Sequence, residues 1–336
     1  MAGDAGRVVF NANQSLLLAG SLAAQRAAGF RGAEVDIASR KLALVSPGGA
    51  ALAAADADAV RLDVAALNSL GADSYLIGGT RSITDQGLDV NVVAERVIVA
   101  NDAQNAFTAP EIVLAATQQV LVQGGSAISA GGAGTSRAGD INITNSDGDG
   151  ALLRVANGPQ ADVTRKVVSG TQGGLTIEAN AVLSAGGAIN LDATRETKLS
   201  GTLNLVPGAG LALASGSIGV GDVQGLSQGL NFDQTAFGAL LARTGDLRLT
   251  SYGTIDFYGK VDGQALLAGN AAPDLRLRAT GLAGLAGANG AIADVTLSGN
   301  RVTLSNPTGT VLAPLAGNGK LTILAQELRT GDGQFA

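Results

Sequence analysis

No cysteine, histidine or tryptophan occurs among the 336 residues of the chain, and methionine occurs once. The absence of cysteine excludes a disulfide framework. Without cysteine and histidine the chain also lacks thiol nucleophiles, the commonest general base and the commonest zinc ligands. Aromatic residues make up only 3% of the chain, so its core must be built from small and branched aliphatic side chains. Such side chains favour thin, regularly stacked layers over one bulky globular centre.

Basic clusters and long apolar runs are also missing. The formal net charge is −6, with 28 acidic and 22 basic side chains, and the basic residues form no cluster that could follow a phosphate backbone. We therefore expect no nucleic-acid partner. No stretch approaches the roughly 18 consecutive apolar residues of a membrane-spanning helix, so we also expect no membrane span.

The first ten residues do not follow the plan of a secretory signal peptide. Asp4 precedes Arg7, and no long apolar segment comes after them. We expect the chain to be a segment of a longer protein, whose export signal, if it is exported, lies outside this segment.

Short stretches in which apolar residues alternate with other residues recur along the chain. The apolar positions within a stretch are two apart, which is the period of a β-strand with one buried face. Successive stretches are offset by seven or eight residues, and glycine, asparagine, aspartate and serine, which allow tight turns, lie between them. Examples are Val35 and Ile37, Leu42 and Leu44, Val90 and Val92, Val97 and Val99, Ile112 and Leu114, Val120 and Val122, Leu247 and Leu249, and Ile255 and Phe257.

Strands this short are unstable as isolated hairpins, and most of them are not separated by helices long enough for βαβ crossovers. A coil of two or three strands, in which each strand pairs in parallel with its equivalent one coil later, satisfies the backbone instead. The 22 residues from Val90 to Ile112 match one three-strand coil. The pattern therefore predicts an all-β fold, namely a right-handed parallel β-helix (solenoid) with short helical excursions.

Segments without the alternation predict departures from this coil. Residues 14–28 and 230–243 are rich in leucine and alanine and predict short helices. Residues 146–171 combine Asp-Gly repeats with a proline and predict a long projecting loop. The predicted organisation is a capping or irregular segment with a helix at 1–33, a β-helix at 34–228, a helical excursion at 229–243 and a continuation of the β-helix at 244–336.

The stretches YLIGGTR at residues 75–81, APEIVLAA at 109–116 and LRLTSYGTIDFYG at 247–259 resemble the C-terminal repetitive region of the filamentous haemagglutinin family of two-partner-secreted exoproteins. The resemblance implies a parallel β-helix that is exported through an outer-membrane transporter partner and is secreted or held at the cell surface. It also implies roles in adhesion, in biofilm formation or in delivery of a toxic C-terminal domain. The chain departs from a whole family member because it has no recognisable secretion domain or toxin domain.

One acidic motif suggests a metal site. Asn145, Asp147 and Asp149, followed by Gly150, match the first half of an EF-hand calcium loop. Ala156 stands at position twelve, where a bidentate glutamate should complete the ligand shell, and Asp-Gly repeats are also common in turns. Asn145, Asp147 and Asp149 are therefore kept only as a weak calcium candidate, and we expect no cofactor.

Catalysis on a carbohydrate would need two carboxylates that converge in a groove with aromatic platforms for the sugar. Three tyrosines, seven phenylalanines and no tryptophan offer few platforms. Most acids fit outward strand positions, where charge keeps the surface soluble, so we expect no catalytic residues and no enzyme. The acidic candidates for such catalysis are Glu178, Asp192 and Glu196, or Asp256 and Asp262.

These observations predict a rigid shaft or adhesive segment that contacts molecules on host or neighbouring cells. Two alternatives stay open, a carbohydrate-binding or carbohydrate-cleaving β-helix and the scaffold of a toxin-delivery exoprotein. A groove holding two acids at catalytic separation would favour the first alternative, and a toxin domain beyond Ala336 would favour the second. If the ends of the coil are uncapped, we expect the chain to associate end to end.

Overall fold

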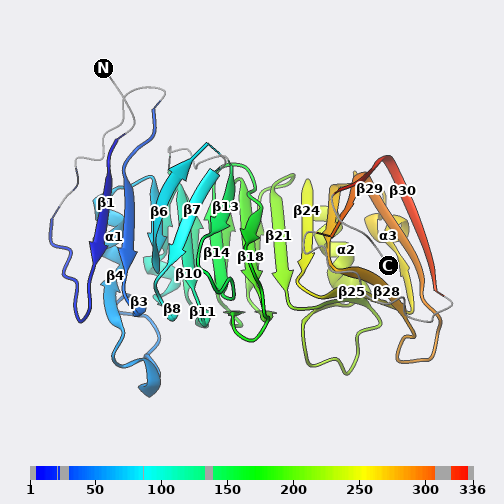
Figure 1. Cartoon of the computed structure of the whole chain (residues 1–336), viewed down its shortest axis with the longest axis horizontal. Coiled ribbons are helices and arrows are strands. Elements are labelled where there is room, and N and C mark those ends of the chain that lie inside the picture. The colour runs from blue at the N-terminus through cyan, green and yellow to red at the C-terminus, as the bar shows by residue number, and fades with distance from the viewer. Residues whose placement is uncertain are drawn as a thin grey trace. The chain divides into compact units, whose positions relative to one another are not determined.

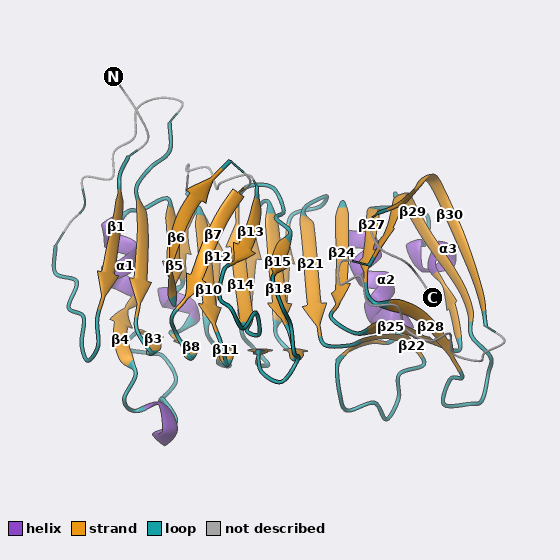
Figure 2. Ribbon diagram, in the orientation of Figure 1, coloured by secondary structure: helices purple, strands orange, loops and turns teal. Residues whose placement is uncertain are grey.

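A computed structural model describes residues 5–20, 22, 30–85, 87–132, 139–306 and 319–331 of the chain. The described residues are mostly β-strands with a few short helices (Figure 2), so the predicted all-β class is confirmed. By its internal contacts the chain divides into two compact units, Met1–Thr194 with Lys198–Leu205, and Arg195–Thr197 with Val206–Ala336. The division falls near residue 200, earlier than the helical segment at 229–243.

The first unit contains sheets that we call A, B, C and D. Sheet A holds, in spatial order, β1 (Arg7–Asn11), β2 (Glu34–Ala38), β5 (Ser74–Ile77), β10 (Glu111–Ala116), β14 (Ala151–Ala156) and β18 (Ala188–Ala193) (Figure 1). Sheet B holds β4 (Val60–Asp63), β3 (Lys41–Val45), β8 (Arg96–Ala100), β11 (Gln119–Val122) and β16 (Gly174–Ile177), and β19 (Glu196–Leu199) lies at the boundary of the units. Sheet D holds β9 (Phe107–Ala109), β12 (Ala127–Ala130), β17 (Val182–Ala185) and β20 (Thr202–Leu205).

The chain visits sheets A, B and D in a constant order. It runs from β10 to β11 to β12 and, after an insertion, from β16 to β17 to β18. All strand pairs within sheets B and D that have a described register are parallel. Val97 of β8, for example, pairs with Val120 of β11, which is one circuit later in the sequence.

Aliphatic side chains and one tyrosine form ladders across sheet A on its inner face. The alternation of the sequence places every second residue of each strand on this face. One ladder is Val35, Tyr75, Ile112, Val155 and Ile189, and the next is Ile37, Ile77, Leu114, Leu153 and Leu191, each at most 1% exposed. Burial of each such side chain contributes about 1.5–3 kcal/mol to the stability of the fold.

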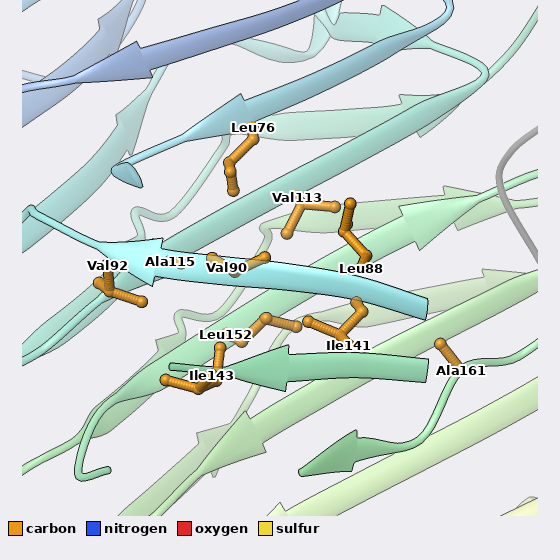
Figure 3. Packing of buried hydrophobic residues seen from close by; sticks show 10 residues of the cluster. All are labelled: Leu76, Leu88, Val90, Val92, Val113, Ala115, Ile141, Ile143, Leu152 and Ala161. Carbon is orange, nitrogen blue, oxygen red and sulfur yellow. The ribbon is translucent and has the colours of Figure 1, made fainter. Parts of the chain in front are cut away.

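Sheet C covers the opposite, outer face of sheet A. Its strands are β6 (Gly79–Thr84), β7 (Gly87–Val92), β13 (Asp140–Ile143) and β15 (Val163–Arg165), with β6 and β7 antiparallel. Figure 3 shows aliphatic side chains of β7 and β13 packed against those of sheet A. The outer face of sheet A is therefore a second buried layer rather than a solvated surface.

Two predictions for this region were wrong. Residues 146–171 do not form a projecting loop as a whole, because β14 lies within them and all of its residues are buried between β10 and β18, antiparallel to both. Val90 lies in sheet C and pairs with Arg81 and Ile143, so it is not the equivalent of Ile112 one coil earlier. The physical reason is an insertion between sheets, which alternation alone does not reveal.

A short helix, α1 (Val64–Leu70), contacts β9 at the end of sheet D. The Asp63 carboxylate accepts hydrogen bonds from the Ala65 and Ala66 amides, and Gly71, with φ of 67°, ends the helix in the left-handed conformation. The Tyr75 hydroxyl donates a 2.5 Å hydrogen bond to the Leu67 carbonyl. The single-turn helices η1 (Ala54–Asp56) and η2 (Ala103–Asn105) lie in connections.

In the second unit, β21 (Gly210–Ser215), β24 (Asp246–Ser251), β27 (Asp274–Arg278), β29 (Asp294–Ser305) and β26 (Lys260–Asp262) follow one another in a sheet, and β30 (Lys320–Thr330) pairs with β29. Sheet E holds β23 (Leu230–Phe232), β22 (Ile218–Gly221), β25 (Thr254–Tyr258) and β28 (Gly281–Leu285). All the strand pairs described here are parallel, and leucine again stacks on leucine at Leu211, Leu247 and Leu275, and at Leu213, Leu249 and Leu277.

Helices α2 (Gln234–Arg243) and α3 (Gly263–Leu267) pack on each other in the second unit. The predicted helix at 230–243 is thus confirmed for its last ten residues, whereas Leu230–Phe232 form a strand. The helix predicted at 14–28 is absent from residues 14–20 and 22, and its other residues lie outside the described part of the chain. Among the described residues, no helix combines the length and apolar character needed to cross a membrane.

Candidate functional site

Ionisable side chains gather on the outer face of sheet A, beneath sheet C. The register of the strands places Asp36, Leu76, Val113, Arg154 and Asn190 in one row across this face. Burial of a lone charge there would be costly, so each charged group needs a partner.

Asp36 of β2 pairs with Arg81 of β6. The Arg81 Nε donates to Asp36 Oδ1 at 2.6 Å, and the Arg81 backbone amide donates to Oδ2 at 2.9 Å. Both side chains are at most 1% exposed. Burial raises the pKa of Asp36 above its ordinary value even though the Arg81 charge and hydrogen bonds act to lower it. The pair fastens sheet C to sheet A.

Glu111 of β10 pairs with Arg154 of the antiparallel strand β14. The Arg154 Nε donates to Glu111 Oε1 at 2.8 Å, and the Ser74 hydroxyl donates to Oε2 at 2.8 Å. Burial acts to raise the pKa of Glu111, but the charges of Arg154 and Arg81 together with these hydrogen bonds outweigh it and lower that pKa. Glu111 is therefore held in its ionised form.

Asp192 of β18 pairs with Arg165 of sheet C. The Arg165 Nη2 and Nε donate to Asp192 Oδ1 at 2.5 and 3.0 Å, and Arg165 also donates to the Gly148 carbonyl at 2.8 Å. Asp192, an acid that sequence reasoning considered for catalysis, is 4% exposed and occupied by this contact. Its geometry suits the joining of two layers rather than proton transfer to a substrate.

The other acids from the sequence have separate structural contacts. Glu178 Oε2 accepts a hydrogen bond from the Gly124 amide at 2.9 Å. Asp262 Oδ1 accepts one from the Ala265 amide at 3.1 Å and so caps the N-terminus of α3. Glu196 lies on β19. None of these contacts places two of the acids together as a catalytic pair.

The calcium candidate residues are also engaged elsewhere. Asn145 donates to the Val92 carbonyl and accepts from the Val92 amide, each at 2.8 Å. Asp147 Oδ1 accepts from the Asp149 amide at 3.1 Å. Asn145 therefore binds the end of β7, and Asp147 stabilises its own turn.

Asp149 holds a loop by its carboxylate. Its oxygens accept hydrogen bonds from the backbone amides of residues 169–172 and from the hydroxyls of Ser169 and Thr171, at 2.5–3.1 Å. Burial acts to raise the pKa of Asp149, but these donors outweigh it and lower the pKa to about 2. Among the described residues, no group of three or more acidic side chains is arranged to hold a metal ion.

Asp256 is the sequence candidate that faces open space. It lies on β25, on the outer face of sheet E, and lines a polar trough of about 340 Å³ together with Asn231 of β23 and Tyr258 of β25. Sequence reasoning missed Asn231 and Gly219, which meet Asp256 only through the register of three strands. No pattern in the sequence indicates that these three residues lie together.

Comparison with protein-family models, curated proteins and solved structures gives no significant match. The likeness to filamentous haemagglutinins therefore remains a prediction that rests on the local stretches of the sequence.

Proposed function

We propose that the chain is a structural and adhesive segment of a secreted or surface-displayed bacterial exoprotein, built as a right-handed parallel β-helix. The constant circuit through sheets A, B and D, with strands of sheets B and D pairing in parallel with their equivalents one circuit later, supports the coil. The right hand follows from the general preference of parallel crossover connections. In the second unit, α2 and α3 would take the place of a third strand in successive coils.

The stacking of similar aliphatic residues at equivalent positions of neighbouring strands is the main support for this proposal. The inner ladder of Ile37, Ile77, Leu114, Leu153 and Leu191 continues through the first unit with no more than 1% exposure. A stack of this kind grows by adding equivalent layers and needs no reactive centre. The ion pairs on the outer face of sheet A join sheet C to sheet A at Asp36 and Asp192 and join two strands of sheet A at Glu111, which suits a load-bearing segment better than a catalyst.

Surface molecules of host or neighbouring cells would be the partners of this segment, and an outer-membrane transporter would export it. The test is attachment of cells to beads coated with the purified chain. We expect saturable attachment that the soluble chain competes away. A variant with the inner ladder broken, Leu114→Ala with Leu153→Ala, should lose it. Attachment that is not competed, or that is equal for the ladder variant, would refute the adhesive role.

A further inference from the structure

The trough on sheet E is centred on strand β22, whose outward-facing residue is the glycine Gly219. Gly219 of β22 lies in register between Asn231 of β23 and Asp256 of β25. Figure 2 shows β22, β25 and β28 together at this part of the fold. Ser217, Ser227 and Gln228 complete the polar lining of the trough.

Glycine at position 219 keeps the trough open. A Cβ atom there would lie 2.4 Å from Asn231 Oδ1 and 3.4 Å from the ring atom Cε2 of Tyr258. The first distance is shorter than a Cβ contact allows, so even alanine would displace the Asn231 amide. The floor of the trough is therefore backbone, with the Asn231 amide and the Tyr258 ring beside it.

Two hydrogen-bond acceptors of the trough, Asn231 Oδ1 and the Asp256 carboxyl, belong to the residues in register with Gly219. Asn231 Nδ2 donates to the Gln228 carbonyl at 2.8 Å, which leaves Oδ1 directed towards the position above Gly219. The Asp256 carboxyl is half-buried and receives a hydrogen bond from Thr254. Burial raises the pKa of Asp256, and no lysine or arginine is among the residues that line the trough.

We propose that this trough binds a neutral saccharide. Sugar hydroxyls would donate to the Asp256 carboxylate and to Asn231 Oδ1, and hydrogen bonds of hydroxyls to a carboxylate are short and strong. The exposed part of the Tyr258 ring would pack against the apolar face of the sugar ring. A pocket with a few convergent polar groups beside an aromatic ring is the usual form of a small-ligand site.

Other ligand classes fit less well. An anion would meet the Asp256 charge without any basic residue in the lining to attract it. Calcium takes six to eight oxygen ligands, usually with several carboxylates, and this lining offers one. A single carboxyl also excludes cleavage by a carboxylate pair, so the site would bind the sugar without hydrolysing it. A saccharide would be a ligand for the proposed adhesive segment. The biological role of the trough rests on the adhesive function, but its binding of a sugar does not.

The test is binding of the intact chain to immobilised neutral glycans ending in glucose, galactose, mannose, fucose or N-acetylglucosamine, followed by calorimetric titration of the best binder. We expect Asp256→Asn to weaken binding about tenfold to hundredfold, because it removes a charged acceptor. Gly219→Ala should abolish binding by moving Asn231. Asp294→Asn, at an exposed acid of the same unit, is the matched control and should bind as the parent does.

Thermal unfolding of each variant separates lost binding from lost folding. No binding by the parent chain to any of these glycans would overturn the proposal, as would affinity that Asp256→Asn and Gly219→Ala leave unchanged. Calcium chloride is titrated in parallel, and calcium binding that Asp256→Asn removes would reassign the trough to a cation. If cells attach to the coated beads but the trough binds no sugar, the adhesive function stands and the saccharide site falls.

Discussion

Replacing Arg154 by methionine removes the charge that Glu111 faces across strands β10 and β14 and leaves a buried carboxylate without its main partner. At an effective dielectric constant of about 20, Coulomb's law gives roughly 6 kcal/mol for unit charges separated by the observed 2.8 Å. Breaking a buried pair by removing one partner lowers the free energy of unfolding by about 3–5 kcal/mol. Because Arg81 still acts on Glu111, we expect the lower end of that range, about 3 kcal/mol at pH 7.

Adding Glu111→Gln to Arg154→Met should recover more than half of this loss, because no buried charge then remains without a partner. The pH dependence gives an independent check. In the parent, the pKa of Glu111 is lowered, so its stabilising contribution is present above the ordinary value of 4.5 and is lost as pH falls through the folded-state pKa. Without Arg154, burial should raise that pKa, so the loss caused by Arg154→Met should shrink as pH falls from about 7 towards 5.

The assay is urea unfolding of the four chains of the double-mutant cycle, followed by far-ultraviolet circular dichroism at both pH values. Asp294→Asn, at an exposed acid of the second unit, serves as a control for nonspecific effects of charge. A loss below about 1 kcal/mol for Arg154→Met, or strictly additive effects of the two substitutions, would refute the account of a coupled ion pair.

Three further predictions follow from single contacts. Asp149→Asn should lower the free energy of unfolding, measured in urea, by about 1–3 kcal/mol at pH 7. Because the pKa of Asp149 is lowered to about 2, the difference between variant and parent should vanish as pH falls from about 4 towards 2. A difference that stays constant over this pH range would contradict the role of the Asp149 carboxylate. Leu114→Ala should lower the free energy of unfolding by about 2–5 kcal/mol. Val167→Ala, at a position 63% exposed, should change it by less than about 0.5 kcal/mol in the same assay. Equal effects of the two substitutions would count against the inner ladder. Leu328 is 54% exposed although its register partner Val302 is fully buried. Light scattering should therefore show concentration-dependent association of the chain that Leu328→Lys reduces. A parent chain that stays strictly monomeric would disprove this association.

The sequence predicted the strands well because their cause is local. Alternating aliphatic residues mark a strand with one buried face whatever it pairs with, as at Val97 and Val120, which pair one circuit apart. The alternation does not show, however, whether a strand runs parallel or antiparallel to its neighbours. Leu153 and Val155 face the interior from an antiparallel strand just as they would from a parallel one. The reversal of β14 was therefore invisible in the sequence.

The outer layers and the trough escaped prediction because they depend on contacts between distant residues. Val90 alternates as a core strand would, but it packs on the outside of sheet A as part of sheet C. Short helices such as α1 have only a capping aspartate and a terminal glycine to mark them. Asn231, Gly219 and Asp256 converge only once three strands are in register. Asp256 was an acid of interest from its residue type alone, whereas its neighbours were not.

Disulfide trapping can test the parallel pairing of strands one circuit apart, because the chain has no cysteine of its own. Ser129 of β12 and Ser184 of β17 are register partners and half-buried, so cysteines fit in their place. Neighbouring strands lie about 4.8 Å apart, within the range that a disulfide spans. We expect Ser129→Cys with Ser184→Cys to form a disulfide in the folded chain, detected by mass spectrometry of its peptides. Ser129→Cys with Thr202→Cys, one strand further along sheet D, should not form one. Failure of the first pair to cross-link, or equal cross-linking of both pairs, would contradict the parallel pairing.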